Sequence, residues 1–327
     1  MAILDPRRPA RALRPVALAI ALFAAPLAAA TAQTYGVGTM QPGTLNHSTG
    51  SAIAKTMQLK AGLQARVQPM AGESVILPLV NSGEIDLGIA NILEVLDAYE
   101  GQAASGRQDG LRVVGVIHPL RVGFFVRKGS PIQTIADLRG KRVTLGFSAM
   151  RTIDRLALAI LATAGLEAKD VQPVLVPNVI RSADDFVAGN ADVFMFALGA
   201  GKVNEVDAAV GGIRILPISG APEALAAARR HFAFLYLTEM APRPGLTGIV
   251  EPTRVTSYDN LLVTFAGAKD EFVHKIVATL TAEKAELVAT APWLQELTPQ
   301  GLYKKYPIPY HPGAVKWFQE NRIEARE

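Results

Sequence analysis

"KRVTLGFSAMRTIDRLALAILATAG" (residues 141–165) contains the patterns of a strand, a polar turn and a helix in immediate succession. One apolar, strand-like run ends near residue 147. An amphipathic helical pattern begins at Arg151, and Gly165 marks its end. The turn between them contains Ser148, Arg151 and Thr152. This turn could bind an anion, take part in catalysis or cap the helix. The patterns in the rest of the sequence distinguish these three roles.

The strand–helix unit recurs on both sides of this stretch. Two blocks with this alternation, residues 35–120 and 125–220, carry buried, β-branched strands. The pattern indicates mostly parallel sheets covered by helices, in two α/β lobes. We expect strands near residues 119–127 and 245–260 to join the lobes around a ligand cleft. Ligands of open α/β sheets lie beyond the carboxyl ends of the strands, which directs attention to the turns there.

Four segments give expectations that a structure can test directly. The helical pattern that follows residue 72 is interrupted by Pro78, and residues 111–117 and 121–129 predict two strands in close succession. A strand is expected over residues 231–237, and a single long helix over 269–291.

The first 32 residues have the pattern of a cleavable export signal. Four arginines precede the apolar run VALAIALFAAPLAA, which is too short to span a bilayer comfortably. The sequence ATA at 30–32 fits a small-x-small cleavage site, so we expect a mature, periplasmic chain that begins at Gln33. A transmembrane anchor is the alternative, and Pro26 with its small neighbours favours cleavage.

Beyond this segment we expect one lobe over 33–120, a second over 121–250, and C-terminal helices (251–327) that return to the first.

Composition narrows the classes of function. The chain has 33 basic and 29 acidic residues, and removal of the segment up to Ala32 leaves 29 and 28. No basic tract remains that would suggest a nucleic acid partner or an anionic membrane surface. The absence of cysteine excludes disulfides, thiolate catalysis and cysteine-ligated metals.

The motifs of common enzymes and cofactor sites are also missing. The five histidines lack metal-ligand spacing, and there is neither an HExxH pattern nor a GxSxG elbow. Gln41 stands where a dinucleotide loop needs its third glycine, and Phe196 stands where a P-loop needs its first. We therefore expect no catalytic activity, no metal and no cofactor.

Polar turns at predicted helix starts are the candidate binding elements. Helix N-termini present free N–H groups and a partial positive charge, which suit a carboxylate or phosphate, although Ser, Thr and Asn there are also ordinary caps. Arg151 is the sharpest candidate, because a guanidinium can clamp a carboxylate, and a surface arginine is the alternative. Glu73 would disfavour an anion near its own turn, or could hold a ligand's ammonium group. The candidate ligand-binding residues are Thr39, Thr44, Asn46, His47, Glu73, Ser74, Asn91, Ser148, Arg151, Thr152 and Phe196.

Four stretches in order resemble a known family. They are SGEIDLGIANILEVLDAYEG (82–101), TIADLRGKRVTLG (134–146), AGNADVFMFALGA (188–200) and PIPYHPGAVKWFQE (307–320). Together they are similar to the TAXI-type solute receptors of TRAP transporters, over nearly the whole mature chain. The resemblance implies a two-lobed, type II-like periplasmic binding protein fold. It also implies a receptor that delivers a small molecule to membrane permease subunits, with transport driven by an ion gradient and no cofactor.

The chain departs from the family where the ligand should sit. Asn46 and His47 replace an aromatic pair, Glu73 replaces a glycine, and Arg151 replaces another glycine. We therefore do not transfer the family's glutamate-like ligands, and expect a small organic anion, a carboxylate of amino-acid or dicarboxylate type, held by different contacts. A receptor for an ATP-driven importer, a ligand-sensing partner of a membrane sensor protein, and a secreted α/β enzyme are the alternatives.

Overall fold

The computed structural model describes residues 33–327, which form one compact unit. The export signal predicted over residues 1–32 lies outside the described residues. Within residues 33–327, none of the helices combines the length and the apolar character needed to cross a membrane.

Strands and helices alternate through most of the described chain. The strands are β1 (Thr34–Thr39), β2 (Gln64–Pro69), β3 (Leu87–Asn91), β4 (Leu111–Arg127), β5 (Arg142–Leu145), β6 (Gln172–Leu175), β7 (Phe194–Ala197), β8 (Ile213–Ile215), β9 (Tyr236–Met240) and β10 (Thr253–Phe265). The α-helices are α1 (Leu45–Ala61), α2 (Glu73–Asn81), α3 (Ile92–Glu100), α4 (Arg151–Ala162), α5 (Val179–Val187), α6 (Gly201–Val210), α7 (Pro222–Arg229), α8 (Asp270–Ala282), α9 (Lys284–Thr290) and α10 (Pro312–Glu320). Short 3-10 helices cover Ala136–Leu138, Ala168–Asp170 and Pro292–Glu296.

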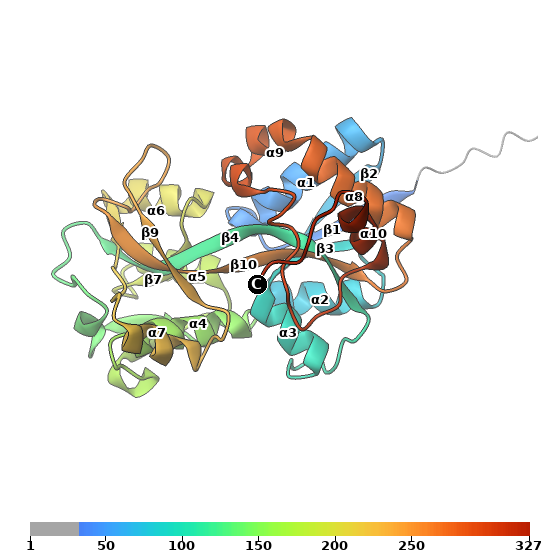
Figure 1. Ribbon diagram of the computed structural model, residues 1–327. Coiled ribbons are helices and arrows are strands. Elements are labelled where there is room, and N and C mark those ends of the chain that lie inside the picture. Colours follow the sequence, from blue (N-terminus) through green and yellow to red (C-terminus); the bar gives the residue numbers. More distant parts are fainter. Residues whose placement is uncertain (1–32) are drawn as a thin grey trace, which may run out of the picture. The chain divides into compact units, whose positions relative to one another are not determined.

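The long strands β4 and β10 run through both lobes and connect them (Figure 1). They pair antiparallel from Val122 opposite Thr256 to Leu111 opposite Phe265. On the side of the first lobe, β3 pairs with β10, and β1 lies parallel between β3 and β2. On the side of the second lobe, β7 and β8 pair with β4, and β9 pairs with β10. The sheet is therefore mixed rather than mostly parallel, because β4 and β10 return through it in opposite directions.

The first lobe combines both ends of the described chain. Helix α1 packs against α8 and α9, and α8 packs against α10. Ile53 and Met57 of α1 share one apolar cluster with Ile276 of α8 and Phe318 of α10. In the second lobe, β5 and β6 form a parallel pair that touches the chain just before β7 through a bridge between Val143 and Val193.

The predicted α/β architecture of two lobes is confirmed. Lobe boundaries at residues 120 and 250 remain our proposal, since β4 and β10 pass through both lobes.

Four predicted segments were wrong in detail. Pro119 does not divide β4, because it stays in register opposite Asp259 of β10. Pro78 does not interrupt α2, which continues through it. The single helix expected over residues 269–291 is divided into α8 and α9 at Glu283, because the φ and ψ of Glu283, −104° and 35°, are not helical. The strand expected from residue 231 begins only at Tyr236.

Candidate functional site

A cavity of about 40 Å3 lies between the two lobes, against β4 and β10. A water molecule needs roughly 10–15 Å3, so the cavity accommodates a few water-sized groups. Its walls are mainly apolar. They consist of Met40, Thr44, Leu45, Asn46 and Glu73 from the first lobe, Leu120, Val122 and Tyr258 from the crossing strands, and Met150, Ile153, Val179, Phe196 and Ala197 from the second lobe.

Two polar residues of the first wall hold the turn after β1 in place. Thr44 caps α1, and its side chain accepts a hydrogen bond from the backbone N–H of His47 at 3.1 Å. Asn46 accepts from the backbone N–H of Met40 at 2.9 Å and donates its Nδ2 to the carbonyl of Ile89 at 2.9 Å. Asn46 therefore ties the turn to β3 with both ends of its amide, so its first role is to position the wall.

Glu73, the first residue of α2, brings a carboxyl group to the cavity. It is buried, and none of the described wall residues is Lys, Arg or His. Its two oxygens accept hydrogen bonds from Asn91, one from the backbone N–H at 3.2 Å and one from Nδ2. Burial raises the pKa of Glu73 to about 8, and the nearby carboxylate of Glu94 contributes to the increase. Glu73 is therefore mostly protonated at pH 7 in the cavity as it stands.

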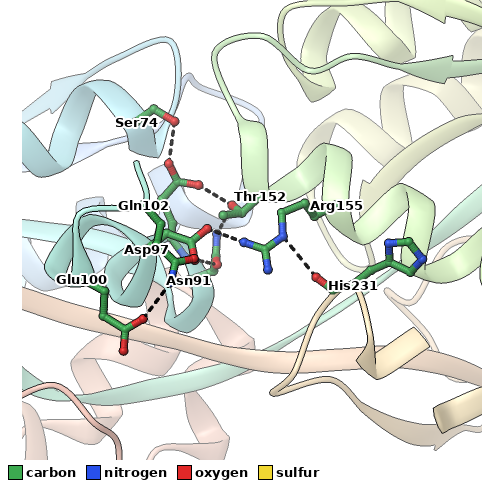
Figure 2. Close-up of polar contacts among 9 residues, drawn as sticks. Ser74, Asn91, Asp97, Glu100, Gln102, Thr152, Arg155 and His231 are labelled. Carbon is green, nitrogen blue, oxygen red and sulfur yellow. Dashed lines mark hydrogen bonds and ion pairs between the residues drawn. The ribbon is translucent and has the colours of Figure 1, made fainter. Parts of the chain in front are cut away.

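Hydrogen bonds continue from Glu73 through Asn91 to the second lobe, and Figure 2 shows the contacts of Ser74, Asn91 and Thr152. The Nδ2 of Asn91 also donates to Thr152 Oγ1 at 3.2 Å, and Thr152 donates to Glu94. Ser74 donates to the other oxygen of Glu94 at 2.5 Å. We call Glu73, Ser74, Asn91, Glu94 and Thr152 the interlobe network. Because Thr152 belongs to α4 and the other four to the first lobe, the network joins the two lobes.

Three further contacts close the rim of the cleft. Arg155 of α4 donates its Nη1 to Asp97 of the first lobe at 2.5 Å, while its Nε is held within the second lobe by the carbonyl of His231 at 3.1 Å (Figure 2). At another edge, the backbone N–H of Lys202 donates to the carbonyl of Gly43 at 3.1 Å. Gly72 approaches the second lobe so closely that a Cβ there would lie 2.1 Å from the carbonyl oxygen of Ala149. The lobes are thus in contact around the cavity, which is a closed arrangement.

The structure places the candidate residues from the sequence in three different positions. Thr44, Asn46, Glu73 and Phe196 are in the wall of the cavity. Ser74, Asn91 and Thr152 belong to the interlobe network immediately behind it. Thr39 and His47 lie next to the cavity and contact each other, with 3.1 Å between Oγ1 and Nδ1. Partial burial lowers the pKa of His47, which favours its neutral form.

Ser148 and Arg151 lie elsewhere. Both side chains are exposed and line a separate surface depression with Asp97, Asp154 and Arg155. Thr152, the next residue of α4, is the one that points to the first lobe. Arg151 is therefore not positioned to clamp a carboxylate inside the cavity in this arrangement. Across residues 33–327, no group of three or more His, Asp or Glu side chains is placed to hold a metal ion.

Sequence reasoning missed most of the apolar wall. Met40 and Met150 lie within the polar turns that were singled out, and this position is a signal that could have identified them. Tyr258 comes from a strand far along the chain, and no local pattern distinguishes it. The partners of Thr152 and Arg155, Glu94 and Asp97, were also missed, because an ordinary helix surface contains many such carboxylates.

A comparison with models of protein families shows which family this chain belongs to. The model described as the NMT1-like family matches residues 37–321. The chain belongs to the NMT1-like family. An Escherichia coli protein designated an aliphatic sulfonates-binding protein is 35% identical over 158 residues, which cover 45% of each chain. The match therefore spans less than half the length of that curated relative.

Solved structures share the fold of this NMT1-like chain. The periplasmic aliphatic sulphonate binding protein SsuA from Escherichia coli has a TM-score of 0.50 at 20% identity, covering 89% of this chain and 93% of SsuA. PhnD1 from Prochlorococcus marinus, solved with methylphosphonate, has a TM-score of 0.56 at 11% identity, covering 89% of this chain and 99% of PhnD1. At these identities the likeness shows the fold alone, which is the two-lobed, Venus flytrap fold of periplasmic binding proteins.

Proposed function

We propose that this protein is a periplasmic solute-binding receptor that captures a small molecule in the cavity between its lobes and delivers it to membrane permease subunits. One observation carries the proposal: residues of both lobes and of the crossing strands enclose one cavity, next to hydrogen bonds that join the lobes. Such a ligand stabilises the closed form only as far as it binds that form more tightly than the open one. Bending of β4 and β10 would open the cleft, as in hinge closure around ligands.

The kind of transporter is the finer part of the proposal. The sequence resemblance to TAXI-type receptors supports delivery to a TRAP-type secondary importer. The sulfonate-binding names of the curated relative and of the solved structure support the alternative, an ATP-driven importer. Uptake of radiolabelled solute by intact cells separates the two. Uptake through a TRAP-type importer stops when the ion gradient is collapsed with ATP maintained, whereas uptake through an ATP-driven importer stops when ATP is depleted with the gradient maintained.

The sequence analysis expected a carboxylate ligand, and that expectation depended on Arg151. In its favour, a helix N-terminus at α4 still faces the first lobe, and the relatives are named for anionic solutes. Against it, Arg151 is exposed outside the cavity, and the described wall has no cationic side chain. We therefore propose the receptor function independently of the ligand's charge.

Thermal unfolding tests the receptor function. The purified protein is heated in the presence of a broad set of amino acids, organic acids, sulfonates and amines. A solute at a hundred times its dissociation constant adds about 2.7 kcal/mol of stability, which raises the Tm by a few degrees. Small-angle X-ray scattering with and without that solute then measures closure. If no solute of any class stabilises the protein, and none copurifies with it in native mass spectrometry, the receptor proposal is wrong.

A further inference from the structure

We infer that the solute of this receptor has a small apolar body and a cationic ammonium head that pairs with Glu73 inside the cavity. This inference rests on the proposed function, because it takes the interlobe cavity as the ligand site. It concerns the chemistry of the ligand, which the receptor function leaves open.

The charges around the cavity favour a cation over an anion. Among the described wall residues, Glu73 alone carries a carboxyl, and no Lys, Arg or His is present. The carboxylate of Glu94 lies behind Glu73 and repels negative charge. An anion brought into this space would lose its hydration near the carboxylate of Glu94, and no cationic side chain of the described wall would compensate its charge, which is the costly case for a buried charge.

Glu73 can accept a further hydrogen bond from a ligand. A carboxylate has about four acceptor positions, two on each oxygen. Asn91 occupies one position on each oxygen through its backbone N–H and its Nδ2, and the side-chain amide of Asn46 also stabilises the ionised form. The remaining positions suit the several N–H donors of an ammonium group, which would then form a charge-assisted bond in a site with little water.

The other walls match an apolar body and do not oppose a cation. Met40 and Met150 offer unbranched side chains that adapt to irregular shapes. The aromatic residues Phe196 and Tyr258 also line the cavity, and aromatic rings attract cations. Burial raises the pKa of Tyr258 well above its usual value, so its hydroxyl stays neutral beside Glu73. The cavity volume of about 40 Å3 restricts the body to a few carbon atoms unless the lobes open slightly.

A cation that pairs with Glu73 must displace the proton from its carboxyl group. Binding should therefore release a proton, which binding of a neutral ligand does not. The titratable groups that face Glu73 are Glu94 of α3 and Tyr258 of β10, and its neutral neighbours are Asn46 and Asn91. With the pKa of Glu73 at about 8, its ionised fraction rises from about 0.1 at pH 7 to about 0.9 at pH 9. An aliphatic ammonium ion, with a pKa of about 10.4 as in lysine, remains mostly charged over this range.

Isothermal titration calorimetry tests the inference with three probes that share the isobutyl group and differ in the head group. They are isobutylammonium, the neutral isobutanol and the anionic isovalerate. We expect isobutylammonium to bind at least about tenfold more tightly than either of the others. Its titration at pH 7, in two buffers of different ionisation enthalpy, should reveal release of about one proton per bound ligand. Its affinity should increase about ninefold between pH 7 and pH 9, following the ionised fraction of Glu73.

A matched pair of variants locates the effect. Glu73→Gln keeps the shape of the side chain and should weaken isobutylammonium binding at least tenfold while abolishing proton release. Glu84→Gln removes an exposed carboxyl and should behave like the wild type. Cooperative thermal unfolding shows that each variant is folded, and the proton release of the wild type tests the inference even if Glu73→Gln is not.

Two results would overturn the inference. One is tighter binding of isobutanol or isovalerate than of isobutylammonium, and the other is binding of isobutylammonium without proton release. A solute that stabilises the protein through the cavity in either case leaves the receptor function intact and rejects only the cationic ligand. Absence of binding by all three probes also rejects the cationic ligand, whereas the receptor function fails only if the broad thermal screen is negative too.

Discussion

Helices α2 and α4 begin on opposite sides of the cavity, and each has a charged residue at its first position. Glu73 begins α2 and is 3% exposed, whereas Arg151 begins α4 and is exposed to solvent. Neither Gly72 nor Met150, which precede them, makes a side-chain capping bond. An ionisable residue at the start of a helix is therefore a buried carboxyl group at α2 and an exposed guanidinium group at α4.

The residue before each helix accounts for the difference. At α4, the side chain of Met150 fills the inward position and lines the cavity, and Thr152 reaches the first lobe. At α2, Gly72 has no side chain, so the inward position falls to Glu73. Successive residues of a helix point about 100° apart. A shift of one position thus decides whether an ionisable group at a helix start faces the cavity or water.

The largest effect is expected from Glu73→Gln on the pH dependence of stability. The pKa of Glu73 is about 8 in the folded protein against an ordinary value of 4.5, so the folded state holds a proton that the unfolded state releases between these values. The wild type should therefore lose stability as the pH rises from 4.5 to 8, on the order of 5 kcal/mol from this group. The variant should lack this slope and be more stable than the wild type at pH 8.

Urea unfolding at pH 5, 6.5 and 8 measures this difference. At pH 5 the variant should be less stable by about 1–3 kcal/mol, because glutamine offers Asn91 only one acceptor oxygen. Glu84→Gln serves as the control that retains the wild-type slope. Parallel pH profiles for wild type and Glu73→Gln would show that Glu73 is ionised in the folded protein, which would remove the contrast between the two helices.

The next effect is expected from Gly72→Ala, which places a side chain between the two helix starts. Its Cβ would lie 2.1 Å from the carbonyl oxygen of Ala149 and 2.8 Å from Cγ of Met150. The backbone of Gly72 is extended, so the substitution disturbs contact between the lobes rather than local geometry. We expect a larger radius of gyration in X-ray scattering and at least about a hundredfold loss of solute affinity. Gly129→Ala, where nothing lies within 4 Å of the added atom, should change neither quantity.

Thr152→Val tests how much the hydroxyl of Thr152, the residue of α4 that reaches the first lobe, contributes to contact between the lobes. Valine keeps the shape but removes the hydroxyl that donates to Glu94 and accepts from Asn91. We expect the closed arrangement to lose about 1–3 kcal/mol, because a buried carboxylate loses a donor. Fluorescence energy transfer between labels on the two lobes should report a more open average, and Thr279→Val on an exposed helix face should not. Unchanged transfer in Thr152→Val would show that the interlobe network does not hold the lobes together.

The smallest effect is expected from Arg151→Ala. Its side chain is exposed, so its removal should change stability by no more than about 0.5 kcal/mol and leave solute affinity unchanged. Arg155→Ala, which breaks a partly exposed ion pair with Asp97, should cost about 0.2–1 kcal/mol. A tenfold or greater loss of affinity in Arg151→Ala alone would restore the carboxylate hypothesis and move the ligand site to the depression at α4.

Local pattern was sufficient to predict the alternation of strands and helices and several polar turns beside the cavity, although four segments were wrong in detail. The helix start at Arg151 followed from the amphipathic pattern and is where α4 begins. Pattern could not predict that Glu73 faces the cavity and Arg151 does not, because one residue of helical register separates the two outcomes. It also could not identify Tyr258, which reaches the cavity only through the pairing of β10 with β4.

The first lobe is assembled from both ends of the described chain, and this determines the order in which a newly made chain can fold. Residues 128–252 between β4 and β10 are contiguous, so most of the second lobe has its partners as soon as that segment has emerged. Ile53 and Met57 of α1 must wait for Phe318 of α10 before their shared cluster is complete. Part of the apolar surface of α1 thus stays uncovered until α10 has been made, and an incomplete chain with such a surface is prone to aggregation.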